Sequence, residues 1–144
     1  MAGNRKKFKN TKIATLIGHD TELYGDIRFF GGLHVNGFIF GNVISDEDPS
    51  SVLILSEQGI IEGEVRAPYV MISGTVIGNV HAHGYIELLP SARITGSVYY
   101  TFIEMAMGAE VNGSLVHQRE EQDEERQPLM SRNDFGSDDA NSLS

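Results

Sequence analysis

Apolar residues along the central part of the chain occupy alternate positions over short stretches that end at glycines. One such unit contains Leu53, Leu55, Ile61 and Val65, with polar or small residues between most of them. A period of two predicts β-strands that bury one face. Val and Ile dominate the apolar positions and no 3.6-residue period is present, which argues against helices.

A repeat sets the spacing of these strands. The pattern apolar, any, Gly, any, apolar recurs along the chain, and VNGFIFGNV (35–43) overlays ISGTVIGNV (72–80) at an offset of 37 residues. One glycine column is spaced by 16, 22, 15, 18 and 17 residues, a mean of about 17.6, and comprises Gly25, Gly41, Gly63, Gly78, Gly96 and Gly113. Three short strands per turn, with roughly six residues on each side, account for this period.

The predicted fold is therefore all-β, a three-sided parallel β-helix (solenoid) of about six turns. Glycine is expected at the corners, where the chain bends through conformations that a Cβ disfavours. An ordinary β-sandwich has no reason to keep a constant register over five units. The polar insertion SDEDPSS (45–51) accounts for the 22-residue spacing and is predicted to bulge outward as a loop.

Charge divides the chain into three parts. Residues 1–12 carry five basic groups and no acid, residues 13–116 carry 12 acids and three arginines, and residues 117–144 carry eight acids and three arginines. The parts sum to the net charge of −9, and every lysine lies in the first twelve residues. We predict a basic disordered arm (1–12), a folded domain (13–116) and an acidic disordered tail (117–144).

Several functional classes are disfavoured by missing residues. The chain has no cysteine, which excludes disulfides, thiol nucleophiles and cysteine-ligated metals. It has no phosphate-loop motif, and its body supplies no lysine for one. No apolar run approaches the roughly 20 residues of a spanning helix. We expect no cofactor and no catalytic residue.

The basic arm is the first candidate interaction site. Its positive charges and one aromatic ring suit anionic lipid, and the residues are Arg5, Lys6, Lys7, Phe8, Lys9 and Lys12. A solvated tail is the alternative, and an acidic body disfavours nucleic acid as a partner. The arm is thus predicted to bind a membrane surface.

The domain over residues 13–116 resembles bactofilins. The resemblance rests on the order and spacing of Ile17-Gly18, LHVNGFIFGNV (33–43), VLILSEQGIIEGEV (52–65), RAPYVMISGTVIGNV (66–80), ELLPSARITGSV (87–98) and EMAMGAEVNGSL (104–115). It implies a right-handed β-helix that polymerises end to end without nucleotide. The resemblance also implies non-polar cytoskeletal filaments at the cytoplasmic face of the inner membrane, with cell-wall enzymes as partners and cell shape as the process served.

The end turns are the predicted polymer interface, because an uncapped solenoid exposes unpaired backbone and apolar core at both ends. At the N-terminal turn the candidates are Leu16, Ile17, Leu23 and Ile27. At the C-terminal turn they are Phe102, Ile103, Met105, Val111 and Leu115.

Histidines and acids offer rival sites. His81 and His83 alternate, a spacing that can bind zinc, but no third ligand is evident and an exposed polar pair is favoured. The acids of loop 45–51 lack the ordered series of oxygens of a Ca²⁺ site. A left-handed hexapeptide-repeat acyltransferase is the enzyme alternative, with His81, His83 or His34 as general base. Its unbroken hexads are missing, so a scaffold is preferred.

Overall fold

The computed structural model describes residues 13–119. All regular elements in this range are strands. They are β1 (Ile13–Ile17), β2 (Glu22–Tyr24), β3 (Ile27–Arg28), β4 (Gly32–Val35), β5 (Phe38–Phe40), β6 (Val43–Ile44), β7 (Val52–Leu55), β8 (Ile60–Glu62), β9 (Val65–Ile72), β10 (Thr75–Ile77), β11 (Val80–Leu88), β12 (Arg93–Thr95), β13 (Val98–Tyr100), β14 (Ile103–Met105), β15 (Glu110–Asn112) and β16 (Leu115–His117).

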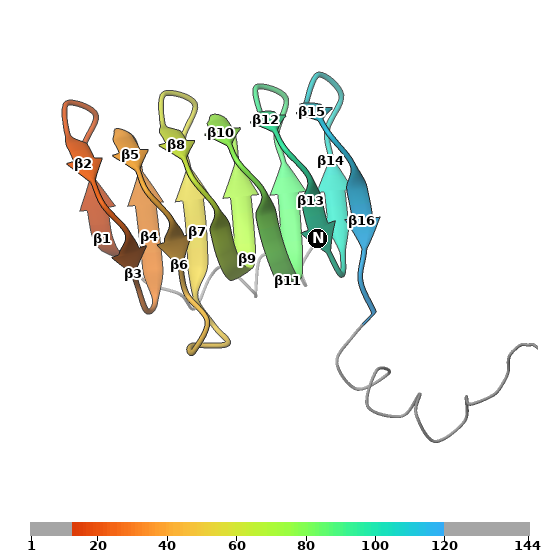
Figure 1. Ribbon diagram of the computed structural model, residues 1–144, viewed down its shortest axis with the longest axis horizontal. Coiled ribbons are helices and arrows are strands. Elements are labelled where there is room, and N and C mark those ends of the chain that lie inside the picture. Colours follow the sequence, from red (N-terminus) through yellow and green to blue (C-terminus); the bar gives the residue numbers. More distant parts are fainter. Residues whose placement is uncertain (1–12, 120–144) are drawn as a thin grey trace, which may run out of the picture.

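The strands stack in parallel on three sides of a coil (Figure 1). The first side runs β1, β4, β7, β9, β11, β14, and the second runs β2, β5, β8, β10, β12, β15. The third runs β3, β6, β9, β11, β13, β16, because β9 and β11 continue around one corner and serve two sides. The predicted three-sided parallel solenoid of about six turns is confirmed.

Inward-facing residues form columns along the axis. The second side supplies Leu23, Ile39, Ile61, Val76, Ile94 and Val111 in register. The four inner members are fully buried, and the two end members are half-buried. Burying one such side chain stabilises the fold by about 1.5–3 kcal/mol. The core is therefore a stack of equivalent layers, complete only where a turn lies on both sides.

The glycine column marks the corner between the second and third sides. All six of its glycines have positive φ, from +128° at Gly25 to +159° at Gly113. The turns also meet closely here: a Cβ on Gly78 would lie 2.1 Å from the carbonyl oxygen of Gly63. Close approach is thus a second reason for glycine, in addition to the bend that the sequence predicted.

The residue after several of the column glycines ties one turn to the next. The Asn42 Oδ1 accepts a hydrogen bond from the Glu64 amide at 2.9 Å, and the Asn79 Oδ1 accepts one from the Ser97 amide at 2.9 Å. Asp26 accepts from the Asn42 amide in the same way. Short polar side chains at this position satisfy corner amides that no strand ladder reaches.

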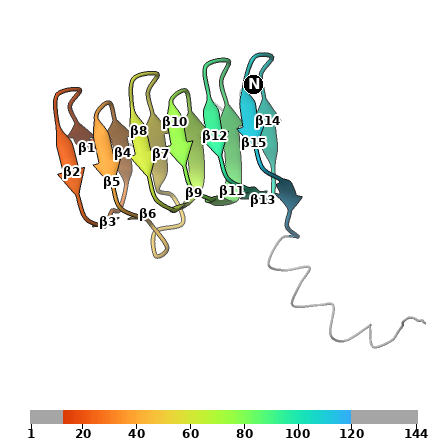
Figure 2. The same ribbon diagram turned by 45° about the horizontal axis from the view of Figure 1, so that its top comes forward.

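The polar insertion forms the predicted outward loop between β6 and β7 (Figure 2). The Ser45 hydroxyl donates to the Ser51 hydroxyl at 2.7 Å and closes the base of the loop. The Asp48 carboxylate accepts from the Ser50 amide, the Ser50 hydroxyl and the Gly31 amide, and these bonds lower the pKa of Asp48. The strands on either side stack without interruption.

Candidate functional site

The two ends of the solenoid are the candidate site. Each strand of the first turn pairs with the second turn only, and β14, β15 and β16 pair only with the turn before them. Within the described residues, one strand edge per side is therefore left without a strand partner at each end. Such edges are templates for pairing with another chain.

The N-terminal turn places three of its four predicted residues toward the core. Ile17 is in register with Val35 and buried, while Leu23 and Ile27 lie in inward columns and are half-buried. Leu16 is in register with His34, whose column faces outward, and is 59% exposed. Leu16 thus lies on the outer face of the first side, beside the open end.

The C-terminal turn exposes residues whose counterparts are core. Ile103, Met105, Val111 and Leu115 continue inward columns and are in register with Ile86, Leu88, Ile94 and Val98. Leu115 is nevertheless 46% exposed, whereas Val98 in the same column is fully buried. Phe102 lies at the adjoining corner and is 51% exposed. Within residues 13–119 no turn follows β14, β15 and β16, so this turn presents an open apolar cross-section.

An outward-facing aromatic pair on the second side was not anticipated from the sequence. The rings of Tyr24 and Phe40 stack at 4.9 Å on the outward face, and Tyr24 is 71% exposed. The Tyr24 hydroxyl donates to Glu22 at 2.8 Å, which raises the pKa of Tyr24. Their positions alternate with the inward Leu23 and Ile39, so strand phase was the signal that could have identified them.

The histidines do not form a common site. His81 Nε2 lies 2.7 Å from a Glu64 carboxylate oxygen, and its ring stacks on Tyr99 at 4.5 Å. His83 lies beside the 45–51 loop, and His34 is on the first side. Among residues 13–119 no group of three or more acids and histidines could hold a metal ion.

The predicted arm and most of the predicted tail lie outside the described residues. This holds for the membrane-binding set Arg5, Lys6, Lys7, Phe8, Lys9 and Lys12. Strand β16 ends at His117, the first residue of the predicted tail, because this residue still pairs with Tyr100. The part of the chain that the structure describes contains no helix long and apolar enough to cross a membrane.

Comparison with known proteins identifies a family with this fold. The bactofilin model, described as polymer-forming cytoskeletal, matches residues 15–116. Bactofilin BacO of Myxococcus xanthus is 28% identical over 101 residues, which cover 70% of this chain and 77% of BacO. Bactofilin BacP of the same organism is 25% identical over 70% of this chain, but the matched region spans only 40% of BacP.

A solved filament extends the match to three dimensions. The cryo-EM reconstruction of Thermus thermophilus bactofilin double helical filaments aligns with a TM-score of 0.63 and 31% identity, over 72% of this chain and 99% of that one. The family match covers the glycine column, all three sides and both open ends. A six-turn parallel solenoid, matched by the bactofilin model over residues 15–116, places this chain in the bactofilin family of polymer-forming cytoskeletal proteins.

Proposed function

We propose that this chain assembles end to end, without nucleotide, into non-polar filaments. These filaments lie at the cytoplasmic face of the inner membrane and act as a scaffold for cell shape or cell-wall enzymes. The observation that carries the proposal is the open apolar cross-section at both ends, where inward columns continue into half-exposed residues such as Leu115. Joining two ends buries these residues and pairs the free strand edges. The family assignment favours this scaffold over the acyltransferase alternative.

A charge at the C-terminal end tests the interface. Leu115→Glu would place a carboxylate in the contact, where burial without a partner is costly. The matched control is Ile77→Glu, because Ile77 is 45% exposed, as Leu115 is 46%, but lies on the outer face of the second side. We expect Leu115→Glu to raise the concentration needed for sedimentable polymer at least tenfold, a change of about 1.4 kcal/mol.

The assay is sedimentation and negative-stain electron microscopy in buffer with EDTA and no nucleotide. Circular dichroism must show that both variants keep the β-sheet signal, so that lost assembly is not lost folding. If Leu115→Glu sediments as wild type does, the end-to-end interface is wrong. If wild type assembles only with added nucleotide, the nucleotide-free part of the proposal fails.

The basic arm supports the membrane part of the proposal. Its five cationic groups are each worth about 1 kcal/mol near an anionic surface, and a polymer multiplies weak arms through avidity. We expect deletion of residues 2–9 to abolish co-sedimentation with phosphatidylglycerol vesicles while filaments still form. Deletion of residues 131–144 is the control and should retain binding. Unchanged binding after removal of residues 2–9 would refute the membrane role of the arm.

A further inference from the structure

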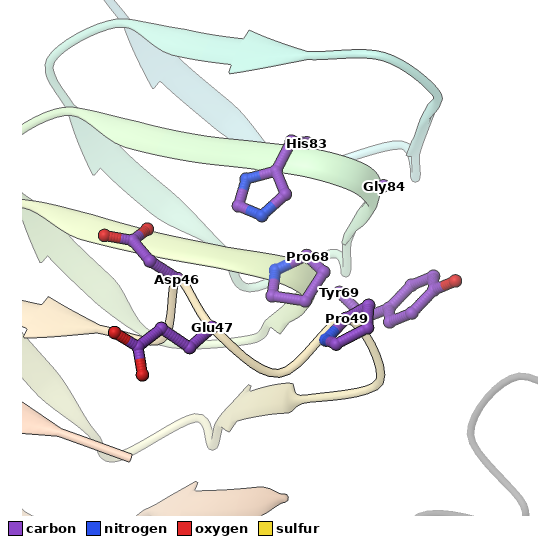
Figure 3. Close-up of a pocket in the computed structure, with 7 residues that line it drawn as sticks. All are labelled: Asp46, Glu47, Pro49, Pro68, Tyr69, His83 and Gly84. Atoms are coloured by element: carbon purple, nitrogen blue, oxygen red, sulfur yellow. The ribbon is translucent and has the colours of Figure 1, made fainter. Parts of the chain in front are cut away.

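A groove runs along one corner of the solenoid, beside the 45–51 loop. It has a volume of about 470 Å³ and lies where the third side bends into the first. Figure 3 shows the carboxylates of Asp46 and Glu47 at one end of the groove, and the rings of Pro49, Pro68 and Tyr69 toward the other. The groove therefore has an acidic end, with the His83 ring beside it, and a stretch lined by proline and tyrosine rings.

The chain enters the solenoid at this same corner. Ile13 is in register with Gly32, Gly32 with Val52, and Val52 with Tyr69, so one row links the start of β1 to the groove. At about 4.8 Å per strand the row is roughly 14 Å long. The twelve residues that precede Ile13 can span up to about 40 Å when extended. The arm therefore begins within easy reach of the groove.

Charge at the groove complements the arm. Asp46 and Glu47 are exposed, and the ion pairs among the described residues involve Asp20, Glu64 and Glu110 rather than these two acids. The arm carries all the lysines of the chain as well as Arg5. Its aromatic residue, Phe8, stands between Lys7 and Lys9 in the sequence. A phenyl ring can pack against the proline and tyrosine rings that line the groove.

We propose that the arm (residues 1–12) docks along this groove of its own chain, with its cations on Asp46 and Glu47 and Phe8 against Pro49, Pro68 and Tyr69. Docking itself does not depend on polymerisation. One consequence rests on the proposed function: the same cations would bind anionic lipid, so the groove and the membrane compete for the arm. Docking would thus hold the arm on the protein until an anionic surface releases it.

Zero-length carbodiimide cross-linking of the full chain tests the contact directly. The reagent joins amines to carboxylates, and all lysines lie in the arm, so each lysine cross-link reports where the arm lies. We expect mass spectrometry to find the major products at Asp46 and Glu47, and to find them lost in 0.5 M NaCl. Major products on the acids of residues 120–144, or spread evenly over exposed acids, would overturn the proposal. The cross-linking is repeated on an equal mixture of ¹⁴N-labelled and ¹⁵N-labelled chains. Docking within one chain predicts that both peptides of each cross-link carry the same isotope. Cross-links that join a ¹⁴N peptide to a ¹⁵N peptide would overturn the proposal.

A charge-neutral variant gives a second readout. Asp46→Asn with Glu47→Gln removes the acidic end without touching the core, and Glu57→Gln with Glu62→Gln is the matched control on exposed acids elsewhere. We expect trypsin to cleave the arm of the groove variant about five times faster than that of the control, and phosphatidylglycerol vesicles to bind it more tightly. Equal cleavage of the two variants would refute docking, whereas faster cleavage without tighter vesicle binding would refute the competition.

Discussion

The glycine column can be tested by adding a single methyl group. In Gly78→Ala the new Cβ would lie 2.1 Å from the carbonyl oxygen of Gly63, and the backbone at position 78 has a φ of +148°. The clash is with backbone rather than with a flexible side chain. The clash is relieved only if the two turns move apart or the backbone dihedral angles at position 78 change.

The cost has two parts. Holding a residue with a Cβ at this φ costs about 1–3 kcal/mol. Separating the turns weakens neighbouring hydrogen bonds, such as those from the Gly63 amide to Ile77 O at 2.9 Å and from the Val65 amide to Asn79 O at 2.9 Å. Each contributes about 1 kcal/mol net. The total is about 3–5 kcal/mol, a large fraction of the stability of a small domain.

Two other glycines separate these contributions. Gly25 has a φ of +128° but no heavy atom within 4 Å of its added Cβ, so Gly25→Ala should cost only the φ strain. Gly18→Ala has neither penalty, because its Cβ would lie 3.7 Å from the Thr21 hydroxyl oxygen at an ordinary φ. Urea unfolding followed by circular dichroism, at a concentration where sedimentation finds no polymer, should rank the losses Gly78, then Gly25, then Gly18. A Gly78→Ala loss no larger than that of Gly25→Ala would refute the close-approach reasoning.

Two further predictions concern polar side chains along the solenoid. Burial and the facing Glu104 raise the pKa of Glu87 above its ordinary 4.5. Protonated Glu87 therefore contributes to the stability of the folded state at low pH, and this contribution is lost as the pH rises through the raised pKa. Glu87→Gln should therefore flatten the fall in urea midpoint between pH 4 and pH 7, and an unchanged slope would contradict this. Asn79→Ala removes the acceptor for the Ser97 amide and should cost about 0.5–1.5 kcal/mol in the same urea assay, whereas Asn79→Asp, which keeps an oxygen acceptor, should cost less.

Much of the solenoid could be predicted from the sequence because its interactions repeat along the chain. Each turn buries the same positions, so alternation and the glycine spacing were enough to predict three sides, about six turns and an outward loop at 45–51. The first and last turns, which are the candidate polymer interface, followed from the same series of repeats. At single residues the prediction was weaker: Leu16 and Ile17 are adjacent and both apolar, yet one faces outward and the other inward. Strand phase at the first turn depends on pairing with β4, which no local pattern reveals.

The sequence by itself determined the periodic features of this protein: the strands, the corners, the turn count and the separation of a basic arm from an acidic body. Only the tertiary structure decided which residues of successive turns contact one another. The stacking of each glycine on the carbonyl of the one before, the aromatic pair of Tyr24 and Phe40, and the groove beside residues 45–51 all join residues at least 15 positions apart. The physical reason is that alternation reports the burial of each residue, whereas contacts between turns depend on how the coil brings successive layers together.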